Sequence, residues 1–136
     1  MAEEYQIDEG RFLLAASIIY MASASGEITL EQWGHFESVV GGNKELLDDA
    51  MQKVRDTPLD EFLIQLAGAL KTDDQRICVL LNVKDSMWAD ERKTDSESLV
   101  YDKFKAALTV TNKNLEVFLE AIVIKNNINL LEAKID

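Results

Sequence analysis

Two polar elbows with the same layout interrupt the chain. The first reads ASGEITLEQ from Ala24 to Gln32, and the second reads ADERKTDSE from Ala89 to Glu97, 65 residues later. Each elbow separates two apolar runs and places a Thr three residues before a Gln or Glu, which is the spacing of a helix capping box. A helix-elbow-helix unit that occurs twice predicts a protein built from two related halves.

The spacing of apolar residues predicts an all-α fold. The chain has one Pro and six Gly, and it lacks strict alternation of polar and apolar residues, which argues against a β-sandwich or barrel. Apolar residues recur at helical spacing between candidate caps and stops. We expect a compact bundle of about seven helices, at roughly 8–24, 29–40, 44–55, 57–70, 72–88, 94–108 and 111–126.

The first and fifth of these helices should be central, because their apolar residues nearly surround the helix axis. With an offset of 65 residues, Ala15 aligns with Leu80 and Ile18 with Val83, so the core positions of the two halves match in type. The halves span about 8–70 and 72–127, and no linker divides them. At 136 residues, the chain should form a single domain over 1–136.

The charge of the chain is negative and unevenly distributed. Net charge is −11, and residues 1–68 hold 13 acidic and 4 basic side chains, against 12 and 10 in residues 69–136. Without clustered Lys and Arg, direct binding to nucleic acid is disfavoured. A cation or a protein partner with a basic surface is the natural complement, and a solvated acidic surface explains the same charge.

Other sequence features indicate a cytoplasmic protein that does not insert into a membrane. No apolar stretch approaches 18 residues, and the acidic N-terminus lacks the positive region of a signal peptide. Cys78 is the single cysteine, which excludes a disulfide within one chain. Because it lies in the apolar run ICVLLNV, we expect Cys78 to be buried and unreactive.

The two elbows resemble those of the tellurite-resistance TerB-like family of helical proteins. In that family each elbow reads Ala, Asp, Gly, an acidic residue, an aliphatic residue and Ser or Thr, then Glu after two further residues. The first elbow here keeps Gly26, Glu27, Ile28 and Thr29 but has neutral residues at both acidic ends. The second elbow keeps both acidic ends and lacks the Gly and the aliphatic residue. The resemblance implies a role in the response to tellurite or other chemical stress and a divalent-cation site made by acidic elbow residues.

Only the second elbow has the chemistry of a calcium or magnesium site. These ions prefer several carboxylate or carbonyl oxygens within one short loop. Asp90 and Glu97 are the leading candidate ligands, with Glu91 and Asp95 as helpers. A structural reading is also available, since the side chain of Glu97 has the spacing to cap the backbone N–H of Thr94.

The residues present favour a binding module over an enzyme. No nucleophile elbow, phosphate loop, HExxH or paired CxxC occurs, and the single histidine, His35, is expected to be a surface or partly packed residue. Trp33 and Trp88 are core or cap-packing residues in the simplest reading, and beside acidic loops they could anchor a partner. Glu27 and Glu31 would contribute acidic charge to that surface.

Two hypotheses for function follow. In the first, the chain is a TerB-like, non-enzymatic module of the stress response that engages a protein partner through an acidic surface and a divalent cation. In the second, it is an acidic interaction protein that needs no metal and competes for a basic surface.

Overall fold

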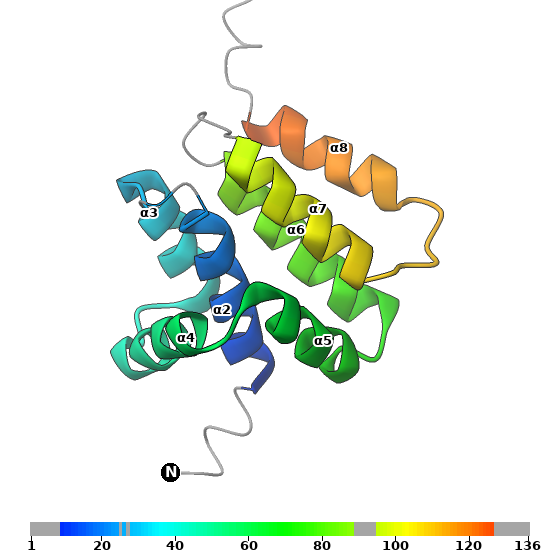
Figure 1. Cartoon of the computed structure of the whole chain (residues 1–136). Coiled ribbons are helices and arrows are strands. Elements are labelled where there is room, and N and C mark those ends of the chain that lie inside the picture. The colour runs from blue at the N-terminus through cyan, green and yellow to red at the C-terminus, as the bar shows by residue number, and fades with distance from the viewer. Residues whose placement is uncertain (1–8, 25, 27, 89–94, 127–136) are drawn as a thin grey trace, which may run out of the picture.

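Seven α-helices form the described part of the chain and are numbered as in Figure 1. The computed structural model describes residues 9–24, 26, 28–88 and 95–126 of the chain, and none of these residues is in a β-strand. The helices span Glu9–Ala22 (α2), Leu30–Val40 (α3), Lys44–Asp56 (α4), Leu59–Ala69 (α5), Asp73–Trp88 (α6), Asp95–Ala107 (α7) and Leu115–Asn126 (α8). The all-α fold class predicted from the sequence is confirmed.

Side-chain caps determine where three of the helices begin. At the start of α3, Thr29 Oγ1 accepts from the backbone N–H of Gln32 at 3.2 Å, and Gln32 Oε1 accepts from the backbone N–H of Thr29 at 3.1 Å. The same pair of bonds joins Thr72 and Gln75 before α6, at 3.2 and 3.1 Å. The capping box predicted in the first elbow is therefore present, and Thr72 with Gln75, which have the same spacing, form another. The pair in the second elbow is not tested, because Thr94 lies outside the described residues. Asn43 caps α4 with its side-chain oxygen.

The observed ends of the helices agree with the predicted ends, with differences of a few residues. Gly41 ends α3 with φ of +84°, a conformation that side chains other than glycine rarely adopt. The first helix, α2, ends at Ala22, two residues earlier than expected, and the elbow that follows contains Gly26 at φ +94°. Pro58 is the N-cap of α5 and not its first helical residue, which is Leu59.

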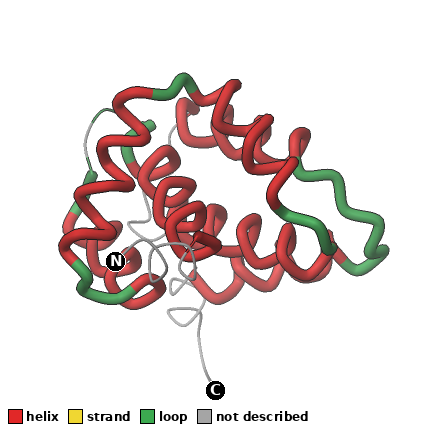
Figure 2. Tube along the Cα trace, turned by 90° about the horizontal axis from the view of Figure 1, so that it is seen from below, coloured by secondary structure: helices red, strands yellow, loops and turns green. Residues whose placement is uncertain are grey.

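The helices pack in two corresponding sets around a central pair. Helices α2 and α6 pack against each other; α3 and α4 pack on α2, and α7 and α8 pack on α6. The two sets also cross, because α3 contacts α6 and α7 contacts α2. Figure 1 shows this arrangement, with α5 placed between the sets and packed on α7, and Figure 2 shows the helices from below. The pairing of helices in the first set thus recurs in the second.

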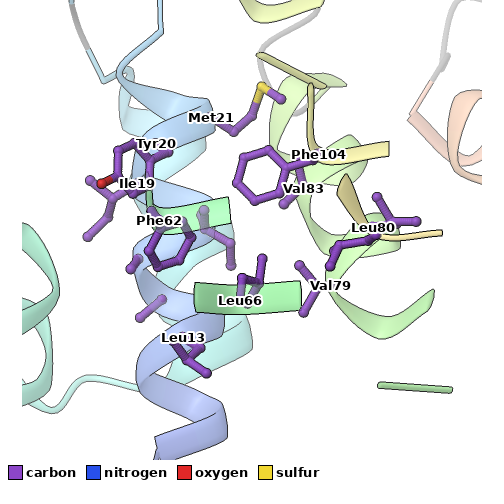
Figure 3. Packing of buried hydrophobic residues seen from close by; sticks show 14 of the residues in the cluster. Leu13, Ile19, Tyr20, Met21, Phe62, Leu66, Val79, Leu80, Val83 and Phe104 are labelled. Carbon is purple, nitrogen blue, oxygen red and sulfur yellow. The ribbon is translucent and has the colours of Figure 1, made fainter. Parts of the chain in front are cut away.

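The core lies between α2 and α6. Ala15 and Leu80, which the offset of 65 residues aligns, are both fully buried, and so are Ile18 and Val83. Phe62 of α5 is also fully buried and belongs to the same cluster (Figure 3). Because α2 and α6 are apolar on several faces, they are stable only when other helices cover most of their surface. The expectation that these two helices are central is confirmed.

Cys78 is the clearest departure from the sequence-based expectation for the core. Its neighbours Ile77 and Val79 are buried, but Cys78 itself is exposed. It lies on a side of α6 that the other helices leave open, at a groove that Arg11 and Val39 also line. The prediction of a buried thiol is therefore wrong, because an apolar run does not reveal which side of a helix is covered.

Polar contacts anchor the first turns of α6 to the neighbouring segments. The guanidinium of Arg76 donates to the carbonyl oxygens of Ala67, Leu70 and Thr109, at 2.9 to 3.1 Å. Asp73 accepts a hydrogen bond of 2.6 Å from the hydroxyl of Thr111. This hydrogen bond is the main reason that the pKa of Asp73 lies below its usual value. These contacts hold the end of α5 and the segment before α8 against α6.

In the described part of the chain, no helix is long and apolar enough to cross a membrane.

Candidate functional site at the two elbows

The helices that follow the two elbows meet in the interior of the protein. Gln32, in α3, donates from Nε2 to Glu97 Oε2, in α7, at 3.0 Å. These two residues are 65 positions apart and occupy the same place in the two elbows. Each side chain is 1% exposed. The equivalent ends of the repeated units therefore bond directly to each other.

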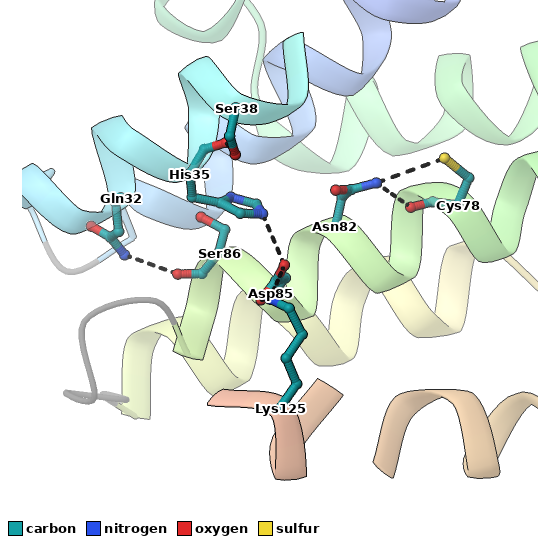
Figure 4. A network of polar contacts seen from close by, with 8 residues as sticks. All are labelled: Gln32, His35, Ser38, Cys78, Asn82, Asp85, Ser86 and Lys125. Atoms are coloured by element: carbon teal, nitrogen blue, oxygen red, sulfur yellow. Dashed lines mark hydrogen bonds and ion pairs between the residues drawn. The ribbon is translucent and has the colours of Figure 1, made fainter. Parts of the chain in front are cut away.

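Gln32 connects three helices with its one side chain. Its Oε1 closes the capping box at Thr29, and its Nε2 also lies 3.5 Å from the backbone carbonyl oxygen of Ser86, in α6 (Figure 4). An amide has both a donor and an acceptor, so it can cap its own helix while it bonds to a carboxylate. A glutamate at position 32 could not donate to Glu97 when both were ionised. The neutral residue in the first elbow therefore has a structural reason.

The Glu97 carboxylate is held inside the protein by this contact. A buried carboxylate loses its water and is stable only when hydrogen bonds replace that water. The amide of Gln32 supplies one such bond, at 3.0 Å. A carboxylate in this position is engaged within the fold and does not project from the surface as an open cation ligand would.

A second polar cluster lies beside this contact. His35 Nε2 lies 3.3 Å from Asp85 Oδ2, and Lys125 Nζ lies 3.0 Å from Asp85 Oδ1, so one carboxylate of α6 faces basic groups from α3 and α8 (Figure 4). The His35 ring nitrogen is not aligned as a hydrogen-bond donor, so its contact with Asp85 is electrostatic and is strongest when the ring is protonated. The side chains of His35 and Asp85 are 10% and 16% exposed. This cluster ties α8 and α3 to the central helix.

The cluster does not have the geometry of a hydrolytic triad. Ser86 follows Asp85 in α6, but its hydroxyl is buried and makes no hydrogen bond to any described residue, so it is neither activated by His35 nor open to a substrate. A nucleophilic serine needs a hydrogen bond to its base and access from solvent. The contacts of Asp85 with His35 and with Lys125 could not be predicted from the sequence, because no motif links positions in three different helices.

The structure brings together only part of the predicted cation site. Asp95 is exposed in the first turn of α7, whereas Glu97 is buried and bonded to Gln32. Asp90 and Glu91 lie outside the described residues. Within the described ranges, no group of three or more His, Cys, Asp or Glu side chains is arranged to hold a metal ion. The candidate ligands that the structure describes therefore do not by themselves form a site for calcium or magnesium, because these ions need several oxygen ligands close together.

The predicted partner-binding residues are only partly on the surface. Trp33 is half-buried against the core, with its ring edge-on to Phe36 at 6.0 Å between centroids. Glu31 is exposed in the first turn of α3, where a negative charge favours the helix dipole. Glu27 and the side chain of Trp88 lie outside the described part of the structure. The packing role of Trp33 is the one that its contacts support.

Helices α3, α4 and α5 carry many more exposed acidic than exposed basic side chains. These three helices carry seven exposed acidic side chains and two exposed basic ones. Within the described residues, only one of the seven, Asp60, has a basic side chain within ion-pair distance, and that partner is Lys103 at 3.3 Å. The acidic charge on these helices is therefore largely not neutralised by the basic side chains that the structure describes.

The two tyrosines of the core respond to burial and to nearby carboxylates. Burial, with a smaller contribution from Glu61, raises the pKa of Tyr20 to about 12. Burial also raises the pKa of Tyr101, helped by Glu116 and Asp102. Both phenols therefore stay neutral at physiological pH, and neither is positioned as a base.

No protein-family model, curated protein or solved structure is significantly similar to the chain.

Proposed function

We propose that the chain is a non-enzymatic interaction module that engages a protein partner with a basic surface. The observation that carries this proposal is the set of seven exposed carboxylates on α3–α5, against two exposed basic residues. A surface of one charge attracts an oppositely charged partner over several ångströms and speeds the encounter. The buried, unactivated hydroxyl of Ser86 supports a binding role over hydrolysis by that group.

The proposal places the chain in the TerB-like group of the tellurite and chemical-stress response. What supports this placement is the pair of elbows and the helical architecture that the resemblance implies. In such a role the module would act by binding to a component of the stress response. The partner's chemistry, a cluster of Lys and Arg, follows from the charge of α3–α5.

Of the two forms of the hypothesis, the geometry favours the one that needs no metal. The side chain of Glu97 is 1% exposed and already accepts from Gln32, so binding a cation there would compete with a contact that joins the two halves. The form with a calcium or magnesium ion remains a proposal, in which Asp90, Glu91 and Asp95 would join Glu97.

A pull-down from the source lysate tests the proposal. The variant Glu45→Gln/Asp48→Asn removes two exposed charges from α4. The matched control, Asp74→Asn/Glu120→Gln, removes two exposed charges from the second half and, like the first variant, includes one from the first turn of a helix.

We expect the α4 variant to capture less of the basic partner than the wild type, and the control to capture a similar amount. Raising the salt from low to physiological ionic strength should weaken capture, because salt screens exposed charges. Capture that does not change with salt or with the α4 charges would contradict the proposal. Loss of capture in a chelator would instead support the form that needs a cation.

A further inference from the structure

We propose that the groove between α5 and α7 is a docking site for a basic amphipathic helix of a partner protein. This inference rests on the proposed function, and it adds where the partner binds and which structure it presents. The occupant is inferred from two properties of the groove, its apolar lining and the charge along its edges.

The groove has a volume of about 590 Å³ and lies between two packed helices. Its apolar walls are made by Leu63 and Ala67 of α5 and by Ala106 and Ala107 of α7. The alanine side chains on α7 are short, so they leave room beside the helix backbone for the side chains of a partner protein. A concave apolar surface of this kind accepts the projecting side chains of a helix.

A large apolar side chain is exposed at the groove. Ile64, which lines it, is 76% exposed. An exposed apolar residue is common on its own, but one that borders an apolar groove enlarges the apolar surface that another molecule can cover.

The charge along the groove selects a basic partner. Asp60 lines the groove, and Glu61 and Asp102 are exposed beside residues that line it, whereas the basic residue here is Lys103. Asp60 and Lys103 are 3.3 Å apart, with side chains 80% and 44% exposed, so water competes with their contact and a partner can replace it at small cost. Lysine or arginine residues on both sides of an apolar stripe would match this pattern.

The length of the groove sets the length of the partner helix. On α5 the residues that line the groove run from Asp60 to Ala67, which corresponds to about 12 Å at a rise of about 1.5 Å per residue. A partner helix of about three turns would cover it, with apolar residues at positions i, i+3, i+4 and i+7.

The probe for the test is a synthetic 14-residue helix with a leucine stripe and lysines on its other faces, labelled with a fluorophore. A peptide of the same composition, scrambled so that it has no apolar face, controls for attraction by charge alone. The protein variants are Ile64→Asp, which places a charge in the groove, and Leu30→Asp. Leu30 is 85% exposed at the start of α3, away from the groove, so it is the matched control.

We expect the full-length wild type to bind the amphipathic peptide at least tenfold more tightly than the scrambled one, measured by fluorescence anisotropy. Ile64→Asp should weaken this binding at least tenfold, because it removes an apolar contact and buries a charge. Leu30→Asp should change it by less than twofold. Circular dichroism of both variants should match the wild type, since both positions are exposed.

Three results would contradict the proposed docking site. These are equal binding of the two peptides, equal effects of the two variants, and no binding of the amphipathic peptide. The proposed function fails on a different result, which is capture of the partner that is insensitive to salt and to the α4 charges. If the α4 variant weakens capture of the partner and Ile64→Asp leaves capture unchanged, the proposed acidic surface is supported and the proposed docking site is contradicted.

Discussion

The hydrogen bond between Gln32 and Glu97 gives the most direct test of how the two halves are joined. We expect Gln32→Leu to lower the free energy of unfolding by about 2–4 kcal/mol. A hydrogen bond to a charged group contributes about 1.5–3 kcal/mol, and loss of the bond that closes the capping box at Thr29 adds about 0.5–1 kcal/mol. Both contacts are present at 3.0 and 3.1 Å, and both Gln32 and Glu97 are buried.

A double-mutant cycle separates the contact between the two side chains from the cap. The single variants are Gln32→Leu and Glu97→Leu, and the double variant carries both. Each single variant leaves one buried polar group without its partner, whereas the double variant replaces both with apolar side chains, which is often far less costly than the sum. We expect a coupling energy of about 1.5–3 kcal/mol.

The assay is urea unfolding followed by far-ultraviolet circular dichroism, with the slope of the transition checked for constancy across variants. Glu97→Gln is the conservative control, because an amide at position 97 can still accept from Gln32, and we expect it to cost less than about 1 kcal/mol. A coupling energy below about 0.5 kcal/mol would refute the view that this contact links the halves. So would a Glu97→Gln variant as unstable as Glu97→Leu.

Further measurements test the core, the charged contacts and the cation hypothesis. Leu80→Ala should lower the free energy of unfolding by about 2–5 kcal/mol and Ile64→Ala by less than about 0.5 kcal/mol, since the first is fully buried and the second is 76% exposed. The hydrogen bond from Thr111 lowers the pKa of Asp73 below its ordinary value, so the stability that Asp73 contributes should be present above that ordinary value and lost as pH falls through the lowered pKa; Asp73→Asn should remove this part of the acid dependence, measured by unfolding at several pH values. Calorimetric titration of calcium and magnesium should show weaker binding to Asp90→Asn/Glu97→Gln than to the wild type if the second elbow holds a cation, and equal binding would exclude it.

Local interactions within the chain were enough to predict the helices. The bonds of Thr29 with Gln32 and of Thr72 with Gln75 span three residues, so their sequence spacing alone predicts them. Burial of α2 and α6 also follows from sequence, because a helix that is apolar on several faces must be covered.

The tertiary structure decided which side chains meet and which are left exposed. Gln32 and Glu97 lie 65 positions apart, and only the packing of α3 and α7 around the central pair brings them to 3.0 Å. The same packing exposes Cys78 next to buried Val79, and Ile64 next to buried Leu63. Helical periodicity gives each residue a direction around its own helix, but the covered directions depend on how the other helices are placed. The hydrogen bond between Gln32 and Glu97 and the groove between α5 and α7 therefore depend on tertiary packing and do not follow from the sequence alone.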